Sequence, residues 1–166
     1  MLHLSSSNRH NWLIPLSLLA GFIWQAWPHD FVFRTLKPDA ILLTTLYWSL
    51  RRPHNISPGI GFIIGIFRDV IEGGLLGQHA LSMAISVYLA QLFSQRLKIF
   101  AIWQQSAVIG GLAAIYLLTG NWVHLLTHHA DESTRFLLPA IGTGLCWPFC
   151  YLVLQQLGRH PSPRPQ

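Results

Sequence analysis

The chain has 166 residues, of which 51% are hydrophobic and only 10% are charged, and its mean hydropathy is +0.38. So few polar side chains cannot cover a soluble globule, which excludes that class and indicates an all-α, multi-pass integral membrane protein. The pI near 9.8 makes nucleic-acid binding a function to consider. However, the Lys and Arg residues are scattered between apolar runs and form no basic stripe, so we expect a lipid bilayer and no nucleic acid.

Six apolar segments follow one another along the chain and are separated by short polar turns. Their approximate bounds are residues 12–29, 38–50, 58–76, 79–95, 99–119 and 134–157. We expect a single domain of six transmembrane helices over residues 1–158, and a short, proline-rich, disordered cytoplasmic tail over residues 159–166. The second segment gives about 20 Å of helix, which is shorter than the roughly 30 Å hydrocarbon core.

The basic residues predict the orientation, because cytoplasmic loops of membrane proteins carry an excess of Lys and Arg. With the amino terminus inside, seven basic residues fall in the cytoplasm: Arg9, Arg51, Arg52, Arg96, Lys98, Arg159 and Arg164. Three fall outside, namely Arg34, Lys37 and Arg135, and Arg68 lies within the third segment. We therefore expect both termini to be cytoplasmic.

The third segment carries a small or acidic residue at every fourth position: Gly61, Gly65, Asp69, Gly73 and Gly77. We call this row the glycine ridge. Residues four apart share a helix face, and glycine there lets another backbone come close, so we expect the ridge to pack against helices. Because four-residue spacing drifts about 40° per step on a 3.6-residue helix, the ridge winds around the axis. We expect its first two glycines to pack within the bundle and its last three residues to meet a partner or a cavity.

Arg68, Asp69 and Glu72 form an intramembrane charge cluster in the same segment. Ionisable groups at membrane depth are costly, and they persist where they are paired, face a protein interior or serve a function. Three interpretations stay open: Arg68 and Asp69 pair inside the bundle, the cluster is a functional site, or it lines a transport pathway. Gly73 and Gly74 can also end the helix early, which would bring Glu72 to the extracytoplasmic interface.

Five residues between the fifth and sixth segments superficially resemble a metal site. They are His124, His128, His129, Asp131 and Glu132. Their spacing matches a closed zinc site only loosely, and no two-histidine motif with a catalytic base is present. We therefore expect a solvated outer loop and no metal.

The remaining polar residues predict no reaction centre. Cys146 and Cys150 fall inside an apolar stretch, where we expect inert packing thiols. No serine or cysteine nucleophile has a base in a recognisable motif, and no glycine-rich phosphate loop follows a strand. We expect no enzyme activity and no cofactor.

Several motifs in the central half of the chain resemble the MreD family of rod-shape-determining membrane proteins. They are Pro38-Asp39, Tyr47-Trp48-Ser49-Leu50-Arg51-Arg52-Pro53, Gly59-x-Gly61-Phe62-x-x-Gly65-x-x-x-Asp69, Gly73-x-Leu75-Leu76-Gly77-x-x-Ala80-Leu81, Tyr88-Leu89, Arg96 and Trp103-Gln104-Gln105. The pattern departs from the family at Arg68, where an apolar residue is expected beside the acidic position.

The resemblance implies a noncatalytic scaffold subunit of the bacterial cell-elongation complex in the inner, or cytoplasmic, membrane. Such a subunit supports cell shape and lateral-wall peptidoglycan synthesis by binding MreC, and through MreC it is linked to MreB filaments, RodA and a class B penicillin-binding protein. The family is also similar in fold to the substrate-binding subunits of energy-coupling-factor transporters. That similarity keeps an alternative open, a small-molecule-binding or transport subunit with a cavity in the helix bundle.

Overall fold

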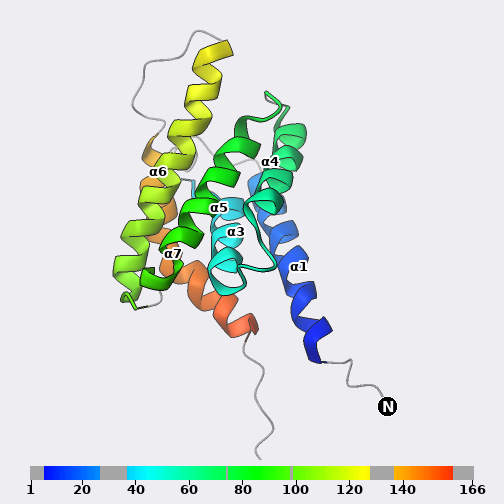
Figure 1. Ribbon diagram of the computed structural model, residues 1–166, viewed down its shortest axis with the longest axis vertical. Coiled ribbons are helices and arrows are strands. Elements are labelled where there is room, and N and C mark those ends of the chain that lie inside the picture. Colours follow the sequence, from blue (N-terminus) through cyan, green and yellow to red (C-terminus); the bar gives the residue numbers. More distant parts are fainter. Residues whose placement is uncertain (1–5, 27–36, 74, 98, 128–136, 159–166) are drawn as a thin grey trace, which may run out of the picture.

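The computed structural model describes residues 6–26, 37–73, 75–97, 99–127 and 137–158, and within these ranges the chain contains six helices and no strand (Figure 1). The helices are α1 (Ser6–Ala26), α3 (Ala40–Arg51), α4 (Pro58–Glu72), α5 (Gln78–Leu97), α6 (Ile102–Thr127) and α7 (Leu138–Gly158). The predicted all-α class and the six helical segments are confirmed.

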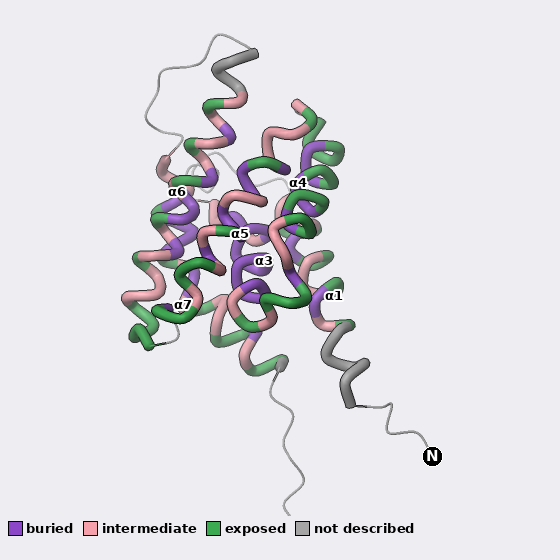
Figure 2. Tube along the Cα trace, viewed as in Figure 1, coloured by how far each residue is buried: buried purple, intermediate pink, exposed green. Residues whose placement is uncertain are grey.

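The short helix α3 forms the core of the bundle (Figure 2). All nine residues from Ile41 to Ser49 are buried, and the helix packs against α1, α5 and α7. Around it, α4 packs on α5, α5 on α6, and α6 on α7. Because protein encloses α3, its side chains contact other helices instead of lipid, which accounts for a helix much shorter than a bilayer core.

Local sequence signals determine where α4 begins and ends. Ser57 caps its first turn by accepting a hydrogen bond from the N–H of Ile60 at 3.3 Å, and Pro58 occupies the first helical position. The helix ends at Glu72 because Gly73 adopts a left-handed conformation with φ of 67° and donates its N–H to the carbonyl oxygen of Asp69. The expected helix end at residue 76 is therefore wrong.

Helix α6 differs from its expected bounds in the other direction. It begins at Ile102 and continues to Thr127, whereas the expected segment covered residues 99–119. The apolar residues Val123, Leu125 and Leu126 continue the helical apolar pattern past Asn121, so the chain stays helical into the region that was expected to be a loop.

The surface of the described bundle is apolar, and its interior contains charged groups. Phe67, Leu145 and Phe149 are 61%, 70% and 73% exposed, whereas Arg68 and Asp69 are 6% and 2% exposed. By length and composition, two described helices can cross a membrane, over Ile102–Val123 and Leu138–Leu157, and Trp12–Ala26 is a shorter apolar helix. This distribution suits a hydrocarbon environment better than water.

Candidate functional site

Polar side chains from four helices meet at one end of the bundle, where α3 begins, α4 ends and α5 begins. We call this set the polar network; its members are Asp39, Arg68, Asp69, Glu72, His79 and Tyr116. The network contains the whole charge cluster predicted from the sequence, together with three residues from other helices.

Arg68 connects three helices through its guanidinium group. One terminal nitrogen donates to Asp39 Oδ2 at the start of α3 and to the hydroxyl oxygen of Tyr116 on α6 at 2.8 Å, and Nε donates to Glu72 Oε1 at 2.8 Å. The side chain is only 7% exposed, so its charge is balanced almost entirely by protein groups. A buried cation with two carboxylate partners avoids the large cost of an isolated charge.

Asp69 has different partners, although it is adjacent to Arg68. Its Oδ2 accepts from the N–H of Gly77 at 2.8 Å and of Ala80 at 3.4 Å, and its Oδ1 accepts from the N–H of His79 at 2.9 Å. These are the free N–H groups of the first turn of α5, so a carboxylate on α4 caps the neighbouring helix. The interpretation in which Arg68 and Asp69 pair with each other is therefore wrong.

His79 lies between the carboxylates of Glu72 and Asp69. Its Nε2 lies 2.9 Å from Glu72 Oε2, and its Nδ1 lies 3.7 Å from Asp69 Oδ1. Glu72 thus contacts both Arg68 and His79, and it is the most exposed of the three carboxylates at 35% of its side-chain surface. The early end of α4 places Glu72 at the open edge of the network.

Asp39 connects the network to α7. Its Oδ1 caps α3 by accepting from the N–H of Leu42 at 3.0 Å, while its own N–H donates to Thr143 Oγ1 at 3.1 Å. The Thr143 hydroxyl donates in turn to the carbonyl oxygen of Pro139 at 2.7 Å. One carboxylate therefore caps α3, pairs with α4 and lies where the chain meets α7.

The glycine ridge divides into two parts with different roles. A Cβ on Gly65 would lie 2.6 Å from the carbonyl oxygen of His79 and closer still to the backbone of Ala80, and one on Gly61 would lie 3.0 Å from Val87 Cγ2. Both glycines therefore allow α4 to lie directly on α5.

Gly73 and Gly77 lie outside the helical part of the ridge. They have φ values of 67° and 102°, and a Cβ on either would meet no atom within 4 Å. The ridge does not continue on one helix, because Gly73 ends α4, which confirms the alternative of an early helix end at this position. Both glycines serve the turn that brings Asp69 to the start of α5.

The other family-motif residues lie on or beside α3. Trp48 donates its indole N–H to Ser17 Oγ on α1 at 2.8 Å, and Pro38 precedes the capping residue Asp39. Arg52 ends α3, with its N–H donated to the carbonyl oxygen of Trp48 at 2.7 Å. Arg51 lies at the end of the bundle opposite the network, with its guanidinium over two tyrosine rings.

The candidate metal and thiol residues do not form a site in the described ranges. His124 belongs to the end of α6, so its expected place in a loop is wrong; His128, His129, Asp131 and Glu132 lie outside the described residues. Cys146 and Cys150 are free and half-buried on α7. Among the residues that the structure describes, no three His, Cys, Asp or Glu side chains gather to hold a metal ion.

Sequence reasoning missed three polar partners in the network region: His79, Tyr116 and Thr143. Asp39 carried a signal, because an aspartate directly before an apolar run is a typical helix N-cap. Gly73 and Gly74 offered an early helix end, and His79 follows them by a short turn, which could have placed it near Glu72. Tyr116 and Thr143 lie inside long apolar segments, and the sequence carries no sign that they face a charge.

Comparison with known proteins agrees with the motif resemblance. Residues 6–157 match the family described as rod shape-determining protein MreD. The rod shape-determining protein MreD of Haemophilus influenzae is 31% identical over 149 residues, which cover 89% of this chain and 92% of that protein. No solved structure matches the chain, so the likeness to energy-coupling-factor subunits stays a prediction. On the strength of a family match over nearly its whole length, the chain belongs to the MreD family of rod shape-determining proteins.

Proposed function

We propose that this chain is a noncatalytic scaffold subunit of the bacterial rod-shape machinery, and that it acts by holding MreC in the inner membrane. The family match supports the role in rod shape. The polar network supports the noncatalytic part, because its hydrogen bonds join helices to one another. Arg68 and Asp69 are both hydrogen-bonded to protein groups, which suits a structural role.

In this proposal all six helices cross the inner membrane, with both termini in the cytoplasm. The end that carries Arg51 and Arg96 then faces the cytoplasm, as expected from the distribution of positive charge. The polar network faces outward, so its carboxylates lie near the extracytoplasmic surface. The apolar outer surfaces of α4 and α7 meet lipid or a partner helix.

We assign MreC binding to the outer face of α4. Gly61 and Gly65 hold the opposite face of this helix against α5, so they are not available to a second chain. The middle of the outer face presents bulky apolar side chains, among them Ile63, Phe67 and Val70, which are 52%, 61% and 65% exposed. In this proposal the transmembrane helix of MreC packs on this face, and MreC links the chain to MreB, RodA and the class B penicillin-binding protein.

Site-specific photo-crosslinking in cells tests this assignment. A photoreactive amino acid at Phe67 on α4 is expected to crosslink to MreC, and the same amino acid at Leu145 on α7 is not. The two positions are matched, since both are apolar and strongly exposed, at 61% and 70%. Equal crosslinking from both positions would reject α4 as the contact surface, and failure of MreC to co-purify with the chain in detergent would reject the scaffold itself.

A second candidate function, a small-molecule-binding subunit, is favoured by one cavity beside the network. It has a volume of about 260 Å³, and its lining includes Gln25, Lys37 and Arg68. Gln25 Oε1 is buried and accepts no hydrogen bond from any described group, while Lys37 Nζ donates to the Gln25 carbonyl oxygen at 2.8 Å. Burial lowers the pKa of the Lys37 ammonium, and the Glu72 carboxylate opposes this shift. A stoichiometric metabolite in native mass spectra of the purified chain would favour this function over the scaffold.

A further inference from the structure

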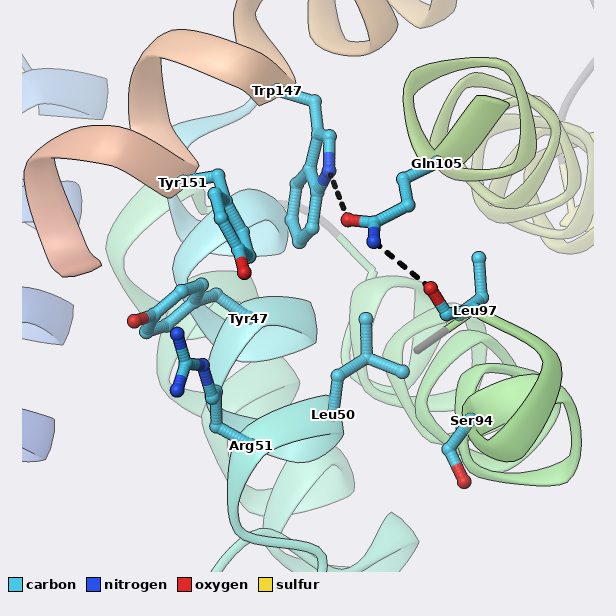
Figure 3. Close-up of a pocket in the computed structure, with 8 residues that line it drawn as sticks. All are labelled: Tyr47, Leu50, Arg51, Ser94, Leu97, Gln105, Trp147 and Tyr151. Atoms are coloured by element: carbon cyan, nitrogen blue, oxygen red, sulfur yellow. Dashed lines mark hydrogen bonds between the residues drawn. The ribbon is translucent and has the colours of Figure 1, made fainter. Parts of the chain in front are cut away.

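Another cavity lies at the end of the bundle opposite the polar network (Figure 3). It has a volume of about 380 Å³ and lies between the last turns of α3 and α5, the first turn of α6 and the middle of α7. Helix α3 separates it from the network, because Asp39 caps one end of this helix and Arg51 is its last residue. None of its lining residues belongs to the network, so it is a separate feature of the fold.

One wall of the cavity combines a cation with aromatic rings. The Arg51 guanidinium carbon lies 5.8 Å from the centre of the Tyr47 ring and 5.7 Å from the centre of the Tyr151 ring, and the Trp147 ring lies 6.0 Å from that of Tyr151. Figure 3 shows the Arg51 guanidinium beside the Tyr47 ring, both from α3, with the side chains of Tyr151 and Trp147 reaching down from α7. Stacking on two rings holds the guanidinium in place, and Tyr47 also accepts a hydrogen bond from it. A guanidinium has five N–H donors, so others remain for a ligand.

The facing wall is held in place by hydrogen bonds. Gln105 Nε2 donates to the carbonyl oxygen of Leu97 at 2.9 Å, and Gln105 Oε1 accepts from the indole N–H of Trp147 at 3.4 Å. Leu50 and Leu97 supply apolar lining. The cavity thus offers a fixed cation beside both aromatic and aliphatic surface.

Arg51 has no carboxylate partner in the described part of the chain. The six acidic residues of the sequence are Asp30, Asp39, Asp69, Glu72, Asp131 and Glu132. The three that the structure describes all belong to the network at the far end, where they meet Arg68 and His79. Arg96, exposed in the last turn of α5, adds a second positive charge near the cavity end. A basic end without acidic side chains attracts an anion from outside the described chain.

We propose that this cavity binds the phosphate headgroup of an anionic phospholipid from the cytoplasmic leaflet, with Arg51 as the phosphate contact. The inference rests on the orientation given under the proposed function, which places this end at the anionic inner surface of the membrane. Tyr47 and Tyr151 belong to a residue type that is enriched at the headgroup level of a bilayer. Leu50 and Leu97 can contact the carbon atoms next to the phosphate, which free inorganic phosphate does not have.

Native mass spectrometry of the delipidated full chain in detergent, titrated with phosphatidylglycerol, tests the proposal. Arg51→Gln is expected to weaken binding roughly tenfold, because it removes the charge-assisted hydrogen bonds to the phosphate. Arg96→Gln is the matched control, because it removes the same charge from the same end of the bundle but lies outside the cavity lining. The affinity of this variant for phosphatidylglycerol should stay within about twofold of that of the unmodified chain. Leu50→Trp, which fills the cavity and keeps Arg51, should also weaken binding.

Three results would overturn the proposal. Equal losses for Arg51→Gln and Arg96→Gln would show diffuse attraction by the whole basic end. Equal affinity of the unmodified chain for phosphatidylcholine would show that the headgroup charge is not recognised, and full displacement of phosphatidylglycerol by inorganic phosphate would make free phosphate the ligand. A cooperative unfolding transition verifies that each variant is folded, and Leu50→Trp carries the test if Arg51→Gln does not fold. Failure here leaves the crosslink between Phe67 and MreC unaffected, so the two proposals fail independently.

Discussion

At the residue scale, single side chains in this protein connect several helices. Asp69 accepts hydrogen bonds from three N–H groups at the start of α5, and Arg68 contacts groups on α3, α4 and α6. Gly65 contributes by having no side chain, because the backbone of α5 occupies the space that a Cβ would need. Each of these residues acts through its contacts with a neighbouring helix, so a substitution there should change the free energy of unfolding.

The first prediction compares two glycines. Gly65→Ala should destabilise the chain by about 1–3 kcal/mol, because the new methyl group forces α4 away from the backbone of α5. Gly111→Ala on α6 is the matched control: its Cβ would meet no atom within 4 Å, and alanine favours a helix by up to about 1 kcal/mol relative to glycine. Denaturation of both variants by sodium dodecyl sulfate in micelles, followed by circular dichroism, measures the difference. Equal midpoints would contradict the close contact at Gly65.

At the element scale, the order and approximate extent of the helices could be predicted from the sequence. Apolar runs marked all six, and Ser57 with Pro58 marked the start of α4. The partners within the network could not be predicted, because Asp39 and Arg68 are 29 residues apart and meet only after α3 and α4 have both packed against α5. The spacing of the ridge predicted a packed face, and Gly65 lies on one. That spacing could not show that Gly73 has a left-handed conformation and ends the helix.

The second prediction concerns the pair that joins α3 to α4. Arg68→Met should cost about 3–5 kcal/mol, because it leaves the buried Asp39 carboxylate without its cation. Asp39→Asn keeps the helix cap and removes the charge. The double variant should lose about 0.5–3 kcal/mol less unfolding free energy than the two single variants lose together. In the double variant both members of the Arg68–Asp39 pair are absent, so neither leaves the other as an unpaired charge.

The control for this cycle pairs Asp39→Asn with Arg51→Gln, which lies at the other end of the same helix. Those two losses should add within about 0.5 kcal/mol, as is usual for distant sites without shared partners. All variants are compared by the same denaturation assay. Additive losses for Asp39 and Arg68 would contradict the ion pair between α3 and α4.

At the scale of the whole molecule, charge and polarity are distributed unevenly in three ways. The described carboxylates gather at one end, Arg51 and Arg96 lie at the other, and apolar side chains cover the outer surface. This distribution suits a protein held across a bilayer with its basic end in the cytoplasm. The internal network sets the positions of the helices, which leaves the outer face of α4 free to hold a partner.

The central claim is that this chain maintains rod shape as a membrane scaffold. Depletion of the protein from its rod-shaped host, with cell length and width scored by microscopy, tests that claim most directly. The account predicts that cells widen and become round as the protein is lost, and that re-expression of the unmodified chain restores rods. Depleted cells that keep the length and width of undepleted rods would contradict it.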